Sequence, residues 1–214
     1  MPLSPPSFRT ERLLLRRFTP HDAESLVALH GDPDVMHFID TGRPVPRTHV
    51  LEKTLPDFLG APEDAPEGHP DDRPGGHPGN RPEDHPAGLG VWAAEVTATA
   101  AFIGWFALLP TAPGRTDEAE LGYRLHRTAW GHGYATEGAR ALVDRAFTTP
   151  ADPPLQRITA TTMTVNHASR RVMEKTGLRH LRTFFDPWPD YIEGAEHGDV
   201  AYALTREEWA ATAA

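Results

Sequence analysis

The sequence contains no cysteine, which excludes disulfide bonds, thiolate nucleophiles and cysteine-ligated zinc. It also has no long hydrophobic run: no segment approaches the roughly 20 apolar residues that a membrane-spanning helix requires. The N-terminal stretch MPLSPPSFRTERLLLRRF holds only a short run of leucines next to arginines, which is unlike the apolar part of a secretory signal. Together these absences predict a cytoplasmic protein.

The chain also has fewer positively than negatively charged side chains. The chain has 21 Lys and Arg against 30 Asp and Glu, a formal net charge of −9. This balance argues against general nucleic-acid binding and favours cationic small partners. With 214 residues the chain can bury a core of its own, and we expect a single domain over residues 1–214, as a monomer or homodimer.

Large apolar side chains are scarce between residues 61 and 90, where proline falls at every fourth position from Pro62 to Pro86. His-Pro recurs there every eight residues, beginning at His69. Such a segment cannot bury enough apolar surface to offset the entropy of ordering. We therefore expect a flexible, partly polyproline-like insertion at about 61–88; a histidine-rich metal site is the weaker alternative, and no metal is predicted.

The remaining residues alternate between strand and helix patterns. Residues 118–126, for example, alternate apolar and polar side chains, the pattern of a half-buried strand. The mixture predicts an α+β fold with a central, mostly antiparallel sheet of about seven strands flanked by helices. Strands are expected at 10–18, 90–96, 100–109, 118–126, 155–165, 179–186 and 198–204, and helices at 19–30, 46–59, 134–148 and 166–177, the last ended by Gly177.

A glycine loop, WGHGYAT, connects the strand at 118–126 to the helix that begins at about Tyr134. The first N–H groups of a helix have no internal acceptor, and the helix dipole favours an anion there. Glycine at 131 and 133 removes the Cβ atoms that would keep a phosphate away. Without further context an ordinary tight turn remains open, and the spacing fits neither a Walker motif nor a dinucleotide fingerprint.

Three separated motifs supply that context. ELGYRLHRTAWGHGYATEGARAL, RITATTMTVNHASRRVMEKTGL and DVAYALTREEW occur in this order, and the N-terminal TERLLLRRFTPHDAESLVALHGDPDVM matches the same group. The chain thus resembles the GNAT superfamily of acyl-CoA N-acetyltransferases, in particular its RimJ/RimL-like group. The resemblance covers nearly the whole chain outside the insertion. It implies a twisted sheet that opens at the cofactor site, with acetyl-CoA as co-substrate.

The resemblance also implies which residues hold coenzyme A. Backbone amides of the glycine loop would bind the pyrophosphate, the strand from Tyr123 to Leu125 would pair with the pantetheine arm, and Asn166 would hydrogen-bond that arm. Trp130 replaces the Gln or Arg usual in the family, which should change packing at the loop entry more than phosphate binding. The implied cofactor-binding residues are Tyr123, Leu125, Trp130, Gly131, His132, Gly133, Tyr134, Ala135, Thr136, Asn166 and Ser169.

For the chemistry, an attacking amine must lose a proton and the leaving thiolate benefits from a donor. Glu120 is the candidate base, with a merely solvent-facing carboxylate as the alternative. Many GNAT enzymes use a tyrosine as the general acid, seven residues after the position of Asn166, where this chain has Met173. Ser169 is the substitute that the group suggests, although a serine in a first helical turn can simply bond to backbone, and the reaction could also proceed without a dedicated acid.

Other polar residues have two interpretations each. His132 is expected to be a surface residue near phosphate rather than a catalyst. Arg170 and Arg171 could reach coenzyme phosphates or only solvate a helix. The run 184–199, with Trp188 and Tyr191, could border a cationic amine or form a plain hairpin loop.

The predicted function is direct acetyl transfer from acetyl-CoA to a primary amine in a ternary complex, because a cysteine thioester intermediate is not available. The acceptor could be a protein N-terminus, a lysine, a small cationic metabolite or an amine-bearing antibiotic. A non-catalytic acyl-CoA-binding or sensing module is the alternative from another class, and a metal-binding scaffold is a distant third.

Overall fold

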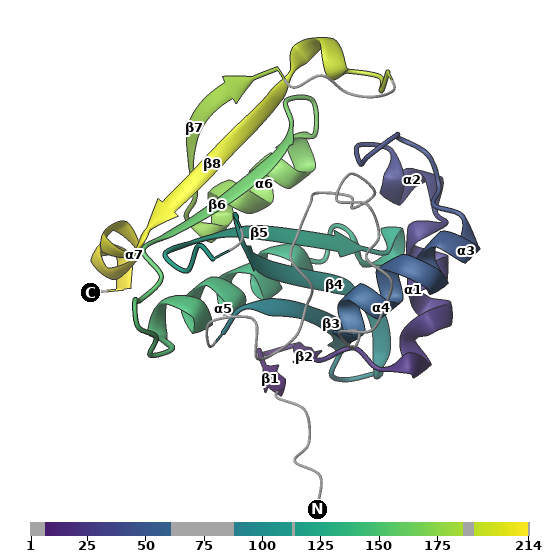
Figure 1. Cartoon of the computed structure of the whole chain (residues 1–214), viewed down its shortest axis with the longest axis horizontal. Helices are drawn as coiled ribbons and strands as arrows, with labels where there is room; N and C mark the ends of the chain where they lie inside the picture. Colours follow the sequence, from purple (N-terminus) through teal and green to yellow (C-terminus); the bar gives the residue numbers. More distant parts are fainter. Residues whose placement is uncertain (1–6, 61–87, 113, 186–190, 214) are drawn as a thin grey trace, which may run out of the picture.

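The computed structural model describes residues 7–60, 88–112, 114–185 and 191–213. Its centre is a sheet of eight strands in the order β1-β2-β3-β4-β5-β6-β8-β7 (Figure 1). The α+β architecture is therefore confirmed. Residues 61–87 of the expected insertion lie outside the described residues.

The sheet has one strand more than expected because the predicted strand at 10–18 corresponds to β2 (Leu13–Arg16), and a further short strand, β1 (Ser7–Arg9), precedes it. The chain reverses between them, and the Leu13 N–H donates to Thr10 Oγ1 at 2.9 Å inside this turn. The sequence pattern missed the turn because no glycine or proline marks it.

All neighbouring strands are antiparallel except β5 and β6, which run parallel. The strands expected at 90–96 and 100–109 are β3 and β4, which pair as an antiparallel hairpin, and the later strands also fall close to their expected ranges. Their bounds are β3 (Gly90–Val96), β4 (Ala101–Pro110), β5 (Glu118–Leu125), β6 (Arg157–Met163), β7 (Arg179–Phe184) and β8 (Asp199–Thr205).

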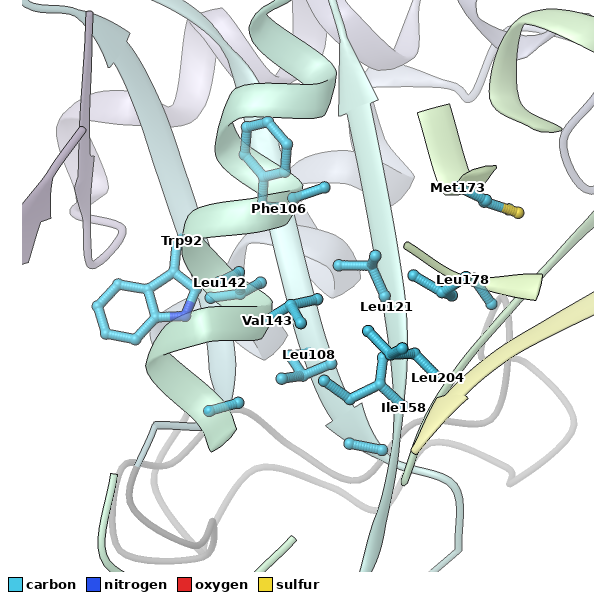
Figure 2. Packing of buried hydrophobic residues seen from close by; sticks show 14 of the residues in the cluster. Trp92, Phe106, Leu108, Leu121, Leu142, Val143, Ile158, Met173, Leu178 and Leu204 are labelled. Atoms are coloured by element: carbon cyan, nitrogen blue, oxygen red, sulfur yellow. The ribbon is translucent and has the colours of Figure 1, made fainter. Parts of the chain in front are cut away.

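Helices cover both faces of the sheet. On one face α5 (Tyr134–Thr148) and α6 (His167–Thr176) enclose the larger core, in which Trp92, Phe106 and Leu142 pack together (Figure 2). On the other face the N-terminal helices cover a smaller core that includes Leu26 and Ala107. These helices are η1 (Pro20–Asp22), α1 (Ala23–His30), α2 (Pro33–Met36), α3 (Arg47–His49), the π-helical η2 (Val50–Thr54) and α4 (Leu55–Leu59).

Helix ends follow local chemistry. Gly177 ends α6 in a left-handed conformation with φ 101°, as predicted. The helix expected from Thr19 begins instead as the 3-10 turn η1, and the helix expected at 46–59 contains the π-helical stretch η2. The described residues also include the short elements η4 (Arg127–Ala129), η5 (Ala195–His197) and α7 (Arg206–Ala213). No helix of the described part is long and apolar enough to cross a membrane.

The single parallel contact in the sheet is short. β5 and β6 pair only from Glu118 to Glu120, opposite 157–159, and beyond Glu120 the two strands diverge (Figure 1). β5 meanwhile stays paired with β4 as far as Leu125. One edge of β5 is thus open from Leu121 onward, at the place where the sequence predicts the cofactor.

Candidate active site

The glycine loop presents unpaired backbone donors at the start of α5. Within the described residues, the N–H groups from Gly131 to Thr136 have no protein acceptor, and the first paired one is Glu137 N, which donates to Gly133 O at 3.0 Å. Gly131 and Gly133 are left-handed, with φ 77° and 82°. A Cβ on Gly131 would meet nothing within 4 Å, so this side of the loop is open to an anion.

A clasp from the N-terminal turn holds the loop in place. The Arg12 guanidinium reaches Glu137 Oε2 at 2.6 and 2.7 Å and donates to the His132 carbonyl at 3.0 Å. Thr10 and the Arg12 backbone N–H also donate to Glu137. Burial opposes ionisation of Glu137, but the hydrogen bonds from Thr10 and Arg12 outweigh it and lower the pKa of Glu137. The Glu137 carboxylate therefore stays ionised at neutral pH, and its ion pair with Arg12 fixes the loop.

The open edge of β5 offers backbone groups for strand-like pairing. A Cβ on Gly104 of β4 would run into the Arg124 carbonyl, so this carbonyl faces β4. Because successive residues of a strand face opposite edges, the carbonyls of Tyr123 and Leu125 face the open side. The Leu125 carbonyl already accepts the Trp130 indole N–H at 2.8 Å. Trp130 thus fixes the loop entry. The Leu125 carbonyl is therefore less available for pairing with the pantetheine arm than the sequence implied.

Asn166 and Ser169 lie at the start of α6, across the opening from β5. Asn166 caps this helix, since its Oδ1 accepts the Ser169 backbone N–H at 3.1 Å. The side-chain oxygen is therefore used structurally, while the amide nitrogen of Asn166 has no acceptor among the described residues and can donate to a ligand.

The Ser169 hydroxyl is in contact with Tyr123. The Tyr123 phenol lies 2.9 Å from Ser169 Oγ and 3.0 Å from the Ser169 carbonyl oxygen. Burial raises the pKa of Tyr123 to about 12, although the hydrogen bond with Ser169 works against this. Tyr123 therefore remains a neutral hydrogen-bond donor at physiological pH. The sequence implied only a backbone role for this residue.

Met173, at the family's usual tyrosine position, lies in the core. It is 2% exposed and belongs to the same cluster as Leu178 and Leu204 (Figure 2). Its thioether has no proton to donate. Hydroxyl groups are instead supplied at the start of α6 by Tyr123 and Ser169, which contact each other.

Glu120 is the last residue of β5 to pair with β6. Its Oε1 accepts the Thr161 hydroxyl at 2.7 Å, and the side chain is half-buried. The next residues of β5 form the open edge, so the Glu120 carboxylate lies at the vertex where the strands separate. A carboxylate in this position can accept a proton from a nucleophile that approaches along the opening. Thr161, its hydrogen-bond partner, was not anticipated from the sequence.

The remaining candidates are spread around the opening. His132 is exposed, and its Nδ1 lies 2.8 Å from the Trp130 carbonyl oxygen, in agreement with a surface position. Arg170 is held by the Thr164 carbonyl at 2.9 Å and by the Tyr202 hydroxyl, whereas Arg171 is exposed.

Tyr191 is 74% exposed and donates to Glu196. Trp188 lies outside the described residues. No group of three or more metal-ligating side chains occurs within the ranges that the structure describes.

These features fit the shape and charge of coenzyme A. The bare amides of the loop suit a pyrophosphate, because the positive end of α5 and the missing Cβ atoms allow close approach. The open edge of β5 suits the amide-bearing pantetheine arm, which can pair as an added half-strand.

Comparison with known proteins gives a consistent family. The acetyltransferase (GNAT) domain family matches residues 12–179. The FsC-acetyl coenzyme A-N(2)-transacetylase of Aspergillus fumigatus is 32% identical over 210 residues, which cover 95% of this chain and 78% of that protein.

Solved structures share the fold at lower identity. A GNAT-family acetyltransferase from Bacillus anthracis has a TM-score of 0.69 at 21% identity, covering 94% of this chain and 99% of that one. Spermidine N-acetyltransferase from Vibrio cholerae, solved with CoA and spermine, has a TM-score of 0.67 at 14% identity with the same coverage. The chain belongs to the GNAT acetyltransferase family and is an acyl-CoA-dependent N-acetyltransferase that takes its acetyl group from acetyl-CoA.

Proposed function

We propose that this enzyme acetylates the primary amine of a small molecule by direct transfer in a ternary complex. The observation that carries the proposal is the position of Glu120 at the vertex of the opening, beside the free edge of β5. Acetyl-CoA supplies the activated acetyl group. The chain supplies binding through the loop amides and proton acceptance at Glu120.

Two observations favour a small acceptor over a protein terminus or lysine. The relative that is 32% identical is named for transfer to an N(2) position of FsC. In addition, the loop after α2 lies close to the segment before β8, since a Cβ on Gly42 would lie 3.3 Å from Ile192 Cγ2. Two segments this close restrict access from that side, which favours a small acceptor. We also propose that the chain belongs to the RimJ/RimL-like group, whose named members act on ribosomal proteins. This proposal concerns the relationship of the sequences and not the acceptor.

The experiment that tests this function is an acceptor screen that measures release of the free CoA thiol. The screen contains small amines, an aminoglycoside, lysine-containing peptides and peptides with free N-termini, each with a control lacking enzyme. We expect the highest kcat/KM among the small amines. A peptide that exceeds every small amine would overturn the choice of acceptor class.

Ser169 and Tyr123 are proposed to act as one hydrogen-bonding unit toward the leaving sulfur. The single phenol proton can go to the Ser169 carbonyl oxygen or to Ser169 Oγ; when it goes to Oγ, the serine hydroxyl proton is left for the thiolate. This would replace the tyrosine that the family usually places where this chain has Met173.

The shared hydrogen bond gives a measurable signature. Ser169→Ala and Tyr123→Phe should each lower kcat about tenfold, the scale of one hydrogen bond to a charged group. The double variant should lose no more than Ser169→Ala alone, because groups in one network are not additive. Ser169→Thr, which keeps the hydroxyl, is the control and should retain most activity. Losses that simply multiply would show that the two residues act separately.

A further inference from the structure

A cation without a carboxylate partner lies beneath the N-terminal helices. Arg124 projects from β5, and its guanidinium lies over the Trp105 ring, 5.3 Å from the centroid. Its Nη1 approaches His30 Nδ1 at 3.0 Å. The Nε is completely buried and has no hydrogen-bond partner, and no ion pair joins Arg124 to a carboxylate in the described part of the chain.

The surroundings neutralise this charge only in part. Burial lowers the pKa of His30 to about 2, with the charge of Arg124 adding to the effect, so the imidazole is neutral. Burial also lowers the pKa of Arg124 to about 10, and Asp40 partly offsets this. Asp40 acts on Arg124 electrostatically, but no ion pair joins the two within the described residues, and the other titratable groups that act on this cluster, His49 and His126, are not anions. A buried guanidinium is costly unless an anion pairs with it.

Arg124 shares a face of β5 with the proposed base. Side chains alternate along a strand, so Glu120, Gly122 and Arg124 project from the same face. Four residues of strand separate the Cα atoms of Glu120 and Arg124 by about 13 Å. Between them Gly122 has no side chain, and a Cβ there would meet only Trp105 and Ala107, at 3.7 and 3.9 Å. This face therefore has a carboxylate at one end, a bare backbone in the middle and a cation at the other end.

We propose that Arg124 binds a carboxylate of the acetyl acceptor, so that the acceptor carries both a primary amine and a carboxylate. The inference rests on the proposed function. With the amine near Glu120, an acceptor lying over Gly122 directs its other end toward Arg124. The planar guanidinium can donate two parallel hydrogen bonds to a carboxylate from its two terminal nitrogens, since the Nε is buried among protein atoms. The ligand then supplies the counter-charge that no residue in contact with Arg124 provides.

The test uses 6-aminohexanoate as the probe and hexylamine as its counterpart without the carboxylate. Calorimetry is performed on the full chain saturated with CoA, which prevents turnover. Wild type should bind 6-aminohexanoate roughly tenfold or more tightly than hexylamine, the effect of a charge-assisted hydrogen-bond pair. Arg124→Gln should remove this difference, and Arg124→Lys, which keeps the charge but loses the fork, should keep part of it.

Asp40→Asn provides an independent arm. If Asp40 competes with the ligand for Arg124, this variant should bind 6-aminohexanoate more tightly than wild type and hexylamine no better. Equal affinity of wild type for the two probes, or an unchanged preference in Arg124→Gln, would overturn the inference. The CoA titration that precedes each experiment separates the two levels, because failure to bind CoA would contradict the proposed function itself.

Discussion

The Glu120→Gln variant is expected to bind acetyl-CoA like wild type but to turn over at least about a hundredfold more slowly, the lower range for loss of a general base. Glutamine keeps the size of the side chain and can still accept the Thr161 hydroxyl, so the vertex of the opening should keep its shape. What is lost is the ability to accept a proton from the amine. The measurement is kcat from CoA thiol release, with binding followed separately by calorimetry.

Glu118→Gln is the matched control for this experiment. Glu118 lies on the same strand and face, but its carboxylate is engaged by Arg115 at 3.2 Å and approaches Arg157 at 3.9 Å. This control should leave kcat within about threefold of wild type, because Glu118 lies two residues before the vertex and is already paired. If Glu120→Gln retained full kcat, the base would be another group, and Glu120 would only fasten β5 to β6.

The Gly133→Asp variant should bind acetyl-CoA at least about a hundredfold more weakly than wild type. This loss corresponds to about 3 kcal/mol of binding free energy, whatever the affinity of the wild type. Two causes combine at this position. The residue is left-handed at φ 82°, which an L side chain adopts only with strain. A Cβ on Gly133 would lie 3.4 Å from Arg12 Nη2, so the added carboxylate would compete with Glu137 for Arg12, and its negative charge at the N-cap of α5 would oppose a pyrophosphate.

Gly114→Asp controls for the backbone strain. Gly114 is also left-handed, at φ 73°, in the connection between β4 and β5, and a Cβ there meets nothing within 4 Å. The substitution adds the same charge and similar strain outside the loop, so acetyl-CoA affinity should be close to that of wild type. Equal losses in both variants would mean that destabilisation, and not the loop, explains the effect.

The sequence was informative where the determinants are local. The strand at 118–126, the helix at 134–148 and the helix end at Gly177 were predicted within a residue or two, because alternation, amphipathic spacing and a left-handed glycine are all read within one turn or strand. The turn that divides β1 from β2 escaped because a hydroxyl, from Thr10, stabilises it instead of a glycine.

What sequence reasoning missed is which distant residues contact the site residues. Ser169 meets the Tyr123 phenol across 46 positions of sequence, and Glu120 meets Thr161 across 41. Arg124 meets His30 across 94. No periodicity reports such pairs, since they depend on which strands become neighbours in the sheet. The alternation along β5 did separate Glu120 and Arg124 from the core side chains, which is the one signal that could have placed both on the acceptor side.

The most direct test of the cofactor placement is amide hydrogen exchange of the wild-type protein with and without acetyl-CoA. Binding through backbone donors should protect the amides of His132–Thr136 and of the open edge of β5 around Tyr123, while those of β3, already paired on both sides, should change little. Protection confined to these two segments is the predicted result. Acetyl-CoA that left both segments unprotected, or that protected another surface instead, would contradict the placement of the cofactor and with it the assignment of Glu120.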